Sequence, residues 1–240
     1  MRAVAIVGMD AEVPPGTVVV VIDVIRAFTT AAVAFERGAT EILCAATSEA
    51  GRDLRRRYPD CLLVGETGGL KPADFDVGNS PFEMSTARLR GRRLVQATSN
   101  GTRGLVRHRD PVALLAASAR NAAATARWIR TSHAGAPCTL VCTGRTAEDL
   151  ACARYLSDLL QGAEPGRAEL VAGITRGAAE HARAYASQPE SGRLDLSDDL
   201  PVLLRCGPVR FRHGRRGPRR SRRPDERVQK GSRGPITSRG

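Results

Sequence analysis

Short apolar runs alternate with helix-like patterns along most of the chain. The apolar runs are mostly continuous rather than alternating, which is typical of strands covered on both faces. They are TVVVVID (17–23), EILCA (41–45), CLLVGE (61–66), RLVQAT (93–98), PVALLAA (111–117) and TLVCTG (139–144). The clearest helix patterns lie between them, at 29–38, 81–91, 121–130 and 147–162. This alternation predicts an α/β domain with a largely parallel sheet.

Residues that commonly begin and end helices stand at the borders of these patterns. In SPFE, Ser80 can cap a helix, Pro81 can be its first residue and Glu83 the return partner of a capping box. The glycines placed to end helices are Gly38, Gly91 and Gly162. Residues 167–187 are predicted as one amphipathic helix or two short ones. The segment LDLSDDLPVLLR (194–205) is predicted as a last extended element.

The strong positive charge is confined to one end of the chain. The formal charge is +12, but residues 205–240 hold 13 of the 37 basic residues and only 2 of the 25 acidic ones. The body, residues 1–204, is therefore nearly neutral, and we interpret it as one domain. Residues 205–240 are rich in Arg, Gly and Pro and have no apolar periodicity, so this tail is predicted to be disordered.

The cysteines and the apolar runs indicate a cytoplasmic protein. The six cysteines include no CxxC pair and no His at finger spacing, which argues against a structural zinc site. No apolar run reaches the roughly 18 residues of a membrane span, and the first residues do not resemble a signal peptide. We therefore expect a reducing cytoplasm and no membrane partner.

Polar side chains follow four of the predicted strands. In parallel α/β sheets, ligands bind beyond the carboxyl ends of strands, where loops converge. The candidates after the strands at 17–23 and 61–66 are Asp23, Arg26, Thr29, Thr30, Glu66, Lys71, Asp76, Asn79 and Ser80. Those after 93–98 and 139–144 are Ser99, Asn100, Gly101, Thr102, Arg145, Glu148 and Asp149. Each has a plain alternative as a turn residue or a helix cap, but their joint occurrence favours a binding site.

These side chains have the chemistry of a site for a small polyanion. Asp23, Glu66 and Asp76 are hard oxygen ligands of the kind that Mg²⁺ takes together with a phosphate. Arg26 and Lys71 can hold anionic oxygens. Hydroxyl and N–H groups that can complete an anion cradle are those of Thr29, Thr30, Asn100, Gly101 and Thr102. We predict that the ligand is a phosphate ester.

Several common phosphate motifs are absent. The first strand imitates the start of a haloacid-dehalogenase-type phosphatase, hhhhDxDx[TV], but Ile25 and Ala27 occupy the second Asp and the Thr/Val positions. The chain also lacks the P-loop pattern, the GxGxxG fingerprint and a CxxxxxR phosphatase loop.

Six segments together resemble the Mg²⁺-dependent 2-phosphosulfolactate phosphatase (ComB) family. They are DVIRAFTT (23–30), GATEI (38–42), VGETGGLKPADFDVGNSPFE (64–83), TSNGTRG (98–104), ASARNAAATA (117–126) and CTGRTAEDLACA (142–153). The segments run in family order over about residues 17–204. Two departures stand out. Ala119 and Arg120 replace a bulkier apolar pair before Asn121, and the likeness ends near Leu204, where a closing strand is expected.

The resemblance implies an α/β/α fold with a mixed sheet and hydrolysis of 2-phosphosulfolactate, a step of coenzyme M biosynthesis in archaea. In this interpretation Asp23, Glu66 and Asp76 supply the ligands of Mg²⁺, while Arg26 and the SNGT loop stabilise the phosphoryl oxygens. The nucleophile is either Asp23 or a metal-bound water. The remaining substrate-binding candidates are Lys71, Asn79, Ser80 and Arg145. Lys71 or Arg145 would take the sulfonate.

Two alternatives remain. Another small phosphorylated acid can be the substrate, because family membership outlasts changes in substrate. A different class of function is nucleic-acid binding through the tail sequence RFRHGRRGPRRSRR (210–223), with contacts to phosphates. The same tail also has the composition of a solvated segment or of a GC-rich gene read in a shifted frame. We expect no nucleic-acid binding by the body, and a homodimer is among the assemblies that this interpretation allows.

Overall fold

The computed structural model describes residues 3–108, 111–186, 195–205, 227–230 and 236–239. Within them the strands are β1 (Val4–Gly8), β2 (Val18–Ile22), β3 (Glu41–Ala45), β4 (Leu62–Gly65), β5 (Arg93–Ala97), β6 (Ala113–Ala117), β7 (Cys138–Cys142), β8 (Arg227–Lys230) and β9 (Ile236–Arg239). They form one sheet in the order β1-β7-β2-β6-β9-β8-β3-β5-β4. The pairs among β1 to β7 are parallel, whereas β8 and β9 pair antiparallel. The largely parallel, mixed sheet is thus confirmed.

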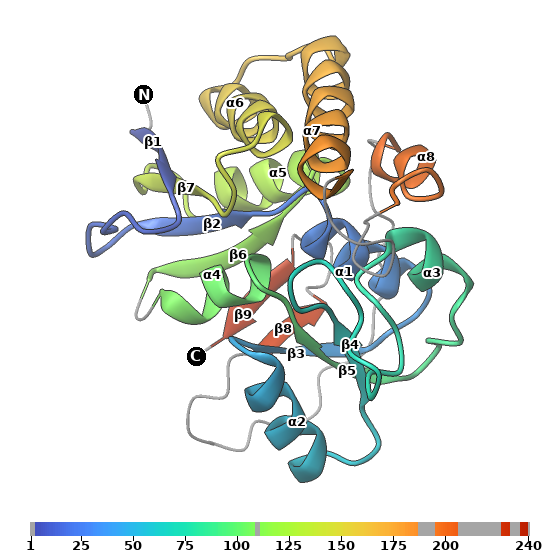
Figure 1. Cartoon of the computed structure of the whole chain (residues 1–240). Coiled ribbons are helices and arrows are strands. Elements are labelled where there is room, and N and C mark those ends of the chain that lie inside the picture. Colours follow the sequence, from blue (N-terminus) through green and yellow to red (C-terminus); the bar gives the residue numbers. More distant parts are fainter. Residues whose placement is uncertain (1–2, 109–110, 187–194, 206–226, 231–235, 240) are drawn as a thin grey trace.

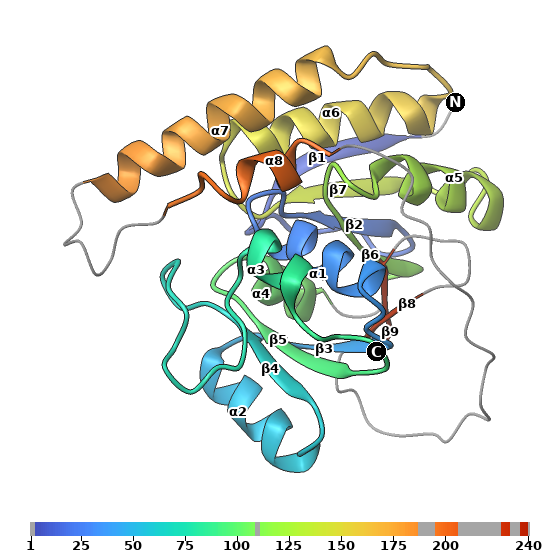
Figure 2. The same cartoon turned by 90° about the vertical axis from the view of Figure 1, so that its right-hand side faces the viewer.

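The helices cover both faces of this sheet (Figures 1 and 2). They are α1 (Ala27–Glu36), α2 (Ser48–Arg57), α3 (Pro81–Thr86), α4 (Gly101–Arg107), α5 (Ala122–Ser132), α6 (Ala147–Gln161), α7 (Ala168–Ala186) and α8 (Leu200–Leu203). One face packs against α1, α3 and α4. The other face packs against α5, α6 and α7 at β2, β6 and β7, and against α2 at β3, β4 and β5. The predicted α/β/α arrangement is confirmed.

Strand β2 shows why its sequence is continuously apolar. All five of its residues are buried. Val19 and Val21 lie in the core beneath α1, whereas Val18, Val20 and Ile22 lie in the core beneath α5 and α6. Because successive side chains point to opposite faces, a strand covered on both sides has no position for a polar residue.

Helix α1 is buried around its whole circumference. Every residue from Ala27 to Phe35 is buried, and only Glu36 at the end is exposed. Alanines allow this close packing, and the two threonines bond within the core. Thr29 Oγ1 donates to Val24 O at 2.7 Å and Thr30 Oγ1 donates to Asn79 O at 3.0 Å. A hydroxyl buried with such a partner does not incur the cost of an unpaired polar group.

Several elements differ from the sequence prediction. Strand β1 and helices α2 and α4 were not predicted. Strand β1 is short and mostly exposed, and α2 buries only Gly51 and Leu54, so both give weak apolar patterns. The predicted extended element at 194–205 is wrong, since α8 lies there. Pro201 in its first turn fits a helix start but could not donate to a strand ladder. Residues 167–187 form one helix, α7, within their described part.

The predicted helix cap at Ser80 is confirmed, with one difference. Ser80 Oγ accepts from the Glu83 N–H at 3.0 Å, but Glu83 Oε2 accepts from the Gly78 N–H rather than from Ser80. The helix ends at Thr86, so the expectation that it runs to Gly91 is wrong. Gly162 does end α6, in the left-handed conformation with φ of 90°.

Two short strands lie within the tail that was predicted to be disordered. Strand β8 pairs with β3, and β9 pairs with β6. The other tail residues lie outside the described residues, apart from Arg205. Among the helices that the structure describes, none is long and apolar enough to cross a membrane.

Candidate active site

Asp23 lies at the carboxyl end of β2 and is held from two sides. Its Oδ1 accepts from the Ala27 N–H at 2.9 Å, and its Oδ2 accepts from Thr143 Oγ1 at 3.2 Å. A Cβ atom on Gly101, the first residue of α4, would lie 2.8 Å from Asp23 Oδ2. The SNGT segment therefore approaches the carboxylate closely, and glycine is the residue that permits this approach. Gly101 and Thr102 are buried there, whereas Asn100 is exposed.

Two neighbouring acids of α6 reach the same end of the sheet. Asp149 Oδ1 accepts from the Val24 N–H at 2.9 Å and its Oδ2 accepts from the Gly144 N–H at 3.0 Å, so it joins the loops after β2 and β7. Glu148 is 1% exposed, and its Oε1 lies 3.0 Å from His181 Nε2. The acids follow a predicted strand in the sequence, but their burial and the partner on α7 were not predicted.

Burial and neighbouring charges disfavour the ionisation of two carboxyl groups at this edge, those of Asp23 and Asp149. Burial, with smaller contributions from the charges of Glu66 and Glu148, raises the pKa of Asp23 to about 6 against the opposing hydrogen bonds from Ala27 and Thr143. Burial and the charges of Asp23 and Glu148 hold the pKa of Asp149 well above its usual range. A cation bound at this edge would favour the ionised forms of both groups.

Glu66 joins two loops of the site. Its Oε2 accepts from the Gly69 N–H and its Oε1 from the Ser99 N–H, both at 2.6 Å. Ser99 Oγ also donates to Oε2, at 3.1 Å. This buried carboxylate fixes the loop after β4 to the SNGT segment, and its charge acts on Asp23.

Arg26 is buried against the loop after β4 and the start of α8. Its Nη1 lies 3.3 Å from Asp199 Oδ2, and its Nη2 donates to Gly69 O at 2.8 Å. Asp199 Oδ1 in turn accepts from Ser80 Oγ at 2.5 Å and from the Phe82 N–H at 3.1 Å. Asp199 therefore orients both Arg26 and the start of α3, a role that its sequence position did not indicate.

Asn79 is the other buried candidate of this loop. Its Oδ1 has no hydrogen-bond partner within the described part of the chain. The hydroxyls of Thr29, Thr30 and Thr102 are buried and donate to backbone carbonyls, so their main contacts hold the fold.

Within the described residues, three predicted site residues form no hydrogen bond or ion pair with Asp23. Asp76 Oδ2 accepts from the Leu63 N–H at 2.7 Å and from Arg55 Nη1 at 2.6 Å. Lys71 is exposed, with Nζ 3.9 Å from Glu83 Oε1, and Arg145 is exposed on its loop. The described residues contain no group of three or more His, Cys, Asp or Glu side chains placed to hold a metal ion. The predicted set of Asp23, Glu66 and Asp76 is therefore not assembled.

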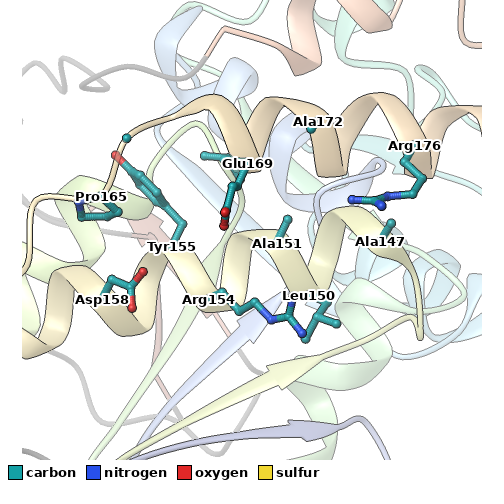
Figure 3. A pocket seen from close by; sticks show the side chains of 12 residues that line it. Ala147, Leu150, Ala151, Arg154, Tyr155, Asp158, Pro165, Glu169, Ala172 and Arg176 are labelled. Atoms are coloured by element: carbon teal, nitrogen blue, oxygen red, sulfur yellow. The ribbon is translucent and has the colours of Figure 1, made fainter.

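A groove of about 510 Å³ lies elsewhere, between α6 and α7 (Figure 3). Its lining includes Tyr155, Asp158, Glu169 and Arg176 but none of the carboxylates around Asp23. It is therefore distinct from the candidate site.

Comparison with known proteins gives the family. Residues 8–196 match the family described as 2-phosphosulpholactate phosphatase, and this range is well over half of the 240 residues. The chain belongs to the 2-phosphosulpholactate phosphatase family. The matched range contains Asp23, Glu66, Asp149 and His181, and it ends before Asp199.

Relatives in the 2-phosphosulpholactate phosphatase family carry the name "probable 2-phosphosulfolactate phosphatase". One from Gloeobacter violaceus is 38% identical over 170 residues, which are 68% of this chain and 72% of the relative. One from Thermus thermophilus is 40% identical over 148 residues, 60% of this chain and 61% of the relative. One from Deinococcus radiodurans is 52% identical over 85 residues, and the match spans only 35% of either chain.

Proposed function

We propose that this protein hydrolyses 2-phosphosulfolactate to sulfolactate and phosphate in a reaction that depends on Mg²⁺. Family membership supports the reaction class. The observation that carries the proposal is Asp23, a buried carboxylate fixed at the carboxyl end of β2 beside the SNGT loop. Parallel α/β sheets place their ligands at this end.

The residues around Asp23 fit a divalent cation in part. Mg²⁺ is usually held by one or two carboxylates together with waters and substrate phosphate. Asp23 and Glu66 would supply these carboxylates, since both are buried at this edge and the charge of Glu66 helps to raise the pKa of Asp23. Asp76 no longer belongs to the set, because it bonds to Leu63 and Arg55. When bound, Mg²⁺ would neutralise charge on the phosphate and favour in-line attack.

Arg26 is the residue best placed to hold the phosphoryl oxygens. A guanidinium has five N–H groups, so the bonds to Asp199 and Gly69 leave donors for an anion. Its orientation is fixed before substrate arrives, and such preorganised charge is often the largest contribution to catalysis. Asn79 belongs to the loop after β4, and its buried Oδ1, which has no partner among the described residues, would accept from a hydroxyl or water.

Asp23 is the proposed reacting side chain, and two routes begin from it. The carboxylate either attacks phosphorus itself or takes the proton of an attacking water at one of its oxygens. A single turnover of ester labelled in its phosphoryl group with ³²P, stopped with acid, separates them. Direct attack transfers the phosphoryl group to Asp23 as the alcohol leaves, so the protein carries ³²P until water cleaves the acyl phosphate and restores the carboxylate; attack by water releases labelled phosphate and leaves no ³²P on the protein.

The proposed reaction is tested by phosphate release from 2-phosphosulfolactate with Mg²⁺, with EDTA, and after Mg²⁺ is restored. We expect turnover only when Mg²⁺ is present. A parallel panel of 2-phospholactate, 3-phosphoglycerate and glycerol 2-phosphate tests the alternative of another small phosphorylated acid. Phosphate release that is equal with EDTA would overturn the metal dependence. Absence of release from every ester would overturn the phosphatase assignment.

We further propose that the reaction takes place in the cytoplasm. The five described cysteines are buried, as expected for thiols that pack as small apolar groups. Light scattering of the purified chain tests whether it forms the homodimer that the sequence interpretation allows.

A further inference from the structure

Helix α7 lies along α6 through residues spaced four apart (Figure 2). Added Cβ atoms at Gly173 and Gly177 would clash with Ala151 Cβ and Glu148 Oε2, well inside the 3.0 Å that real Cβ atoms keep. The next residue at this spacing is His181, which therefore lies on the same face of α7. The two glycines bring the helices close enough for His181 to meet Glu148.

Glu148 pairs with His181. The carboxylate is 1% exposed, Oε1 lies 3.0 Å from His181 Nε2, and Oε2 has no partner within the described residues. The hydrogen bond that His181 donates to Glu148 raises the pKa of His181, and burial opposes this rise. The charges of Glu148 and Asp23 add to the rise, whereas that of Arg26 lowers the pKa. An imidazolium stabilises a buried carboxylate that has no other partner.

His181 faces the candidate site. Its partner Glu148 precedes Asp149, which accepts from the N–H of Val24, the residue after Asp23. One turn beyond His181, Tyr185 packs against Gly69, whose carbonyl accepts from Arg26. Its side chain is 23% exposed, so the ring is accessible while Glu148 beneath it is not.

The other cations suggested for a second anionic group are less suitable. Lys71 is 44% exposed and lies near Glu83, and Arg145 is exposed. Arg26 already bonds to Asp199 and Gly69 and is assigned to the phosphate. A ligand that carries a phosphate and a further acid group needs positive charge at a second position.

We propose that His181, held by Glu148, binds the second acidic group of the substrate, its carboxylate or sulfonate. This inference rests on the proposed function and names the end of the substrate that α7 recognises. Glu148 acts through His181 and is a positioning residue.

Binding of product-like ligands to the full chain with Mg²⁺ tests the proposal. We would titrate inorganic phosphate, sulfolactate, lactate and 2-hydroxyethanesulfonate by calorimetry into the wild type, His181→Gln and the control His133→Gln. His133 lies at the end of α5 against Trp128. We expect His181→Gln to weaken sulfolactate binding at least tenfold and to leave phosphate binding within twofold. Lactate and 2-hydroxyethanesulfonate show which acid group His181 binds.

The pH dependence supplies a readout that a merely structural role would not change. The charged groups that act on His181 are Glu148 of α6, Asp23 after β2 and Arg26 before α1. Because the pKa of His181 is raised, sulfolactate affinity should be high at lower pH and fall as pH rises through that pKa. Ionisation of Asp23 also weakens anion binding. The difference in sulfolactate affinity between the wild type and His181→Gln at each pH therefore gives the contribution of the imidazole. Glu148→Gln should move the fall to lower pH.

The outcomes separate this inference from the proposed function. Equal sulfolactate affinity in the wild type and His181→Gln overturns the inference. It is also overturned if His181→Gln weakens phosphate binding as much as sulfolactate binding, or if the wild type does not bind sulfolactate. The KM for 2-phosphosulfolactate should rise with His181→Gln, with less effect on kcat. If the protein binds sulfolactate through His181 but never hydrolyses 2-phosphosulfolactate, the proposed function fails and the binding site stands.

Discussion

At the scale of single residues, Asp23 is fixed in place and yet kept from easy ionisation. Hydrogen bonds from Ala27 and Thr143 hold its two oxygens, while burial raises its pKa to about 6. These contributions oppose each other, and burial is larger. A carboxyl group in this state can hold a proton near neutral pH or release it when a cation approaches.

Asp23→Asn should abolish turnover of 2-phosphosulfolactate and preserve the fold. The amide can keep the bond from Ala27 and donate to Thr143 Oγ1, so the packing is retained. The change removes the carboxylate charge, and activity should fall at least a hundredfold. The exposed Asp60→Asn is a matched control and should keep full activity. Undiminished turnover by Asp23→Asn would remove Asp23 from the mechanism.

The same substitution should alter the pH dependence of stability. A carboxyl whose pKa is raised by folding stabilises the protein below its ordinary pKa, and this stabilisation is lost as pH rises to the folded value. For Asp23 the loss lies between 3.8 and about 6 in the metal-free protein. It amounts to roughly 2–3 kcal/mol of the free energy of unfolding. Denaturant unfolding of the wild type from pH 4 to pH 7 should show this fall, and Asp23→Asn should reduce it.

At the scale of elements, the contact of α6 and α7 determines where the acids of α6 point. Gly173 and Gly177 remove two side chains from the interface, and Glu148 occupies part of the space. Asp149, one residue on, turns toward Val24 and Gly144 instead. Consecutive acids in the first turn of one helix therefore serve two different partners.

Gly177→Ala should destabilise the protein although alanine favours helices. The added methyl group would overlap Glu148, and overpacking of this kind costs roughly 1–3 kcal/mol. The gain in helix propensity is at most about 1 kcal/mol. Gly166→Ala, where a Cβ atom meets nothing within 4 Å, is the control. Urea unfolding measures both variants, and an unchanged or raised stability of Gly177→Ala would show that α7 can shift without cost.

At the scale of the whole molecule, the sheet is completed by the end of the chain. Strands β8 and β9 lie between β6 and β3 and so join the two parallel parts of the sheet. Without them, β3 and β6 would each present an unpaired edge, and such edges promote aggregation.

A chain that ends at Leu204 should therefore unfold at a lower temperature and aggregate more readily than the full chain. A second variant, with the arginines between 206 and 226 changed to glutamine, retains β8 and β9 and should keep the thermal midpoint. Both changes should remove any salt-dependent binding of nucleic acid that the tail provides. Equal midpoints for the full and shortened chains would show that the two strands contribute nothing to stability.

The sequence predicted the central strands well because burial on both faces leaves a continuous apolar run, as in β2. It could not predict α2, whose sequence is mostly charged and whose helix depends on a few contacts with β3, β4 and β5. Pattern arguments identify an element by what it buries, so an element that buries little gives a weak signal.

The site residues that could be predicted are those in the loops that follow the predicted strands. Asp23, Arg26 and Glu66 were found in this way, although their roles stay predictions. Asp76 was expected beside them, but the loop returns along β4, so that Val77 pairs with Val64 and Asp76 reaches Leu63. The contributions of His181 and Asp199 depend on contacts between distant segments, which no local pattern specifies. In α7, the four-residue spacing of Gly173, Gly177 and His181 was the sequence feature that could have indicated the close contact with α6.

Helix α1 has no solvent face before Glu36, and this should govern how its sequence can vary. In a surface helix, tolerated substitutions recur with the helical period, because one side is free. In α1, saturation mutagenesis from Ala27 to Phe35 scored by soluble yield should show no such period. Intolerance at every position would mean that the helix next to Asp23 changes only together with its neighbours, so that the site's framework diverges more slowly than the surface around it.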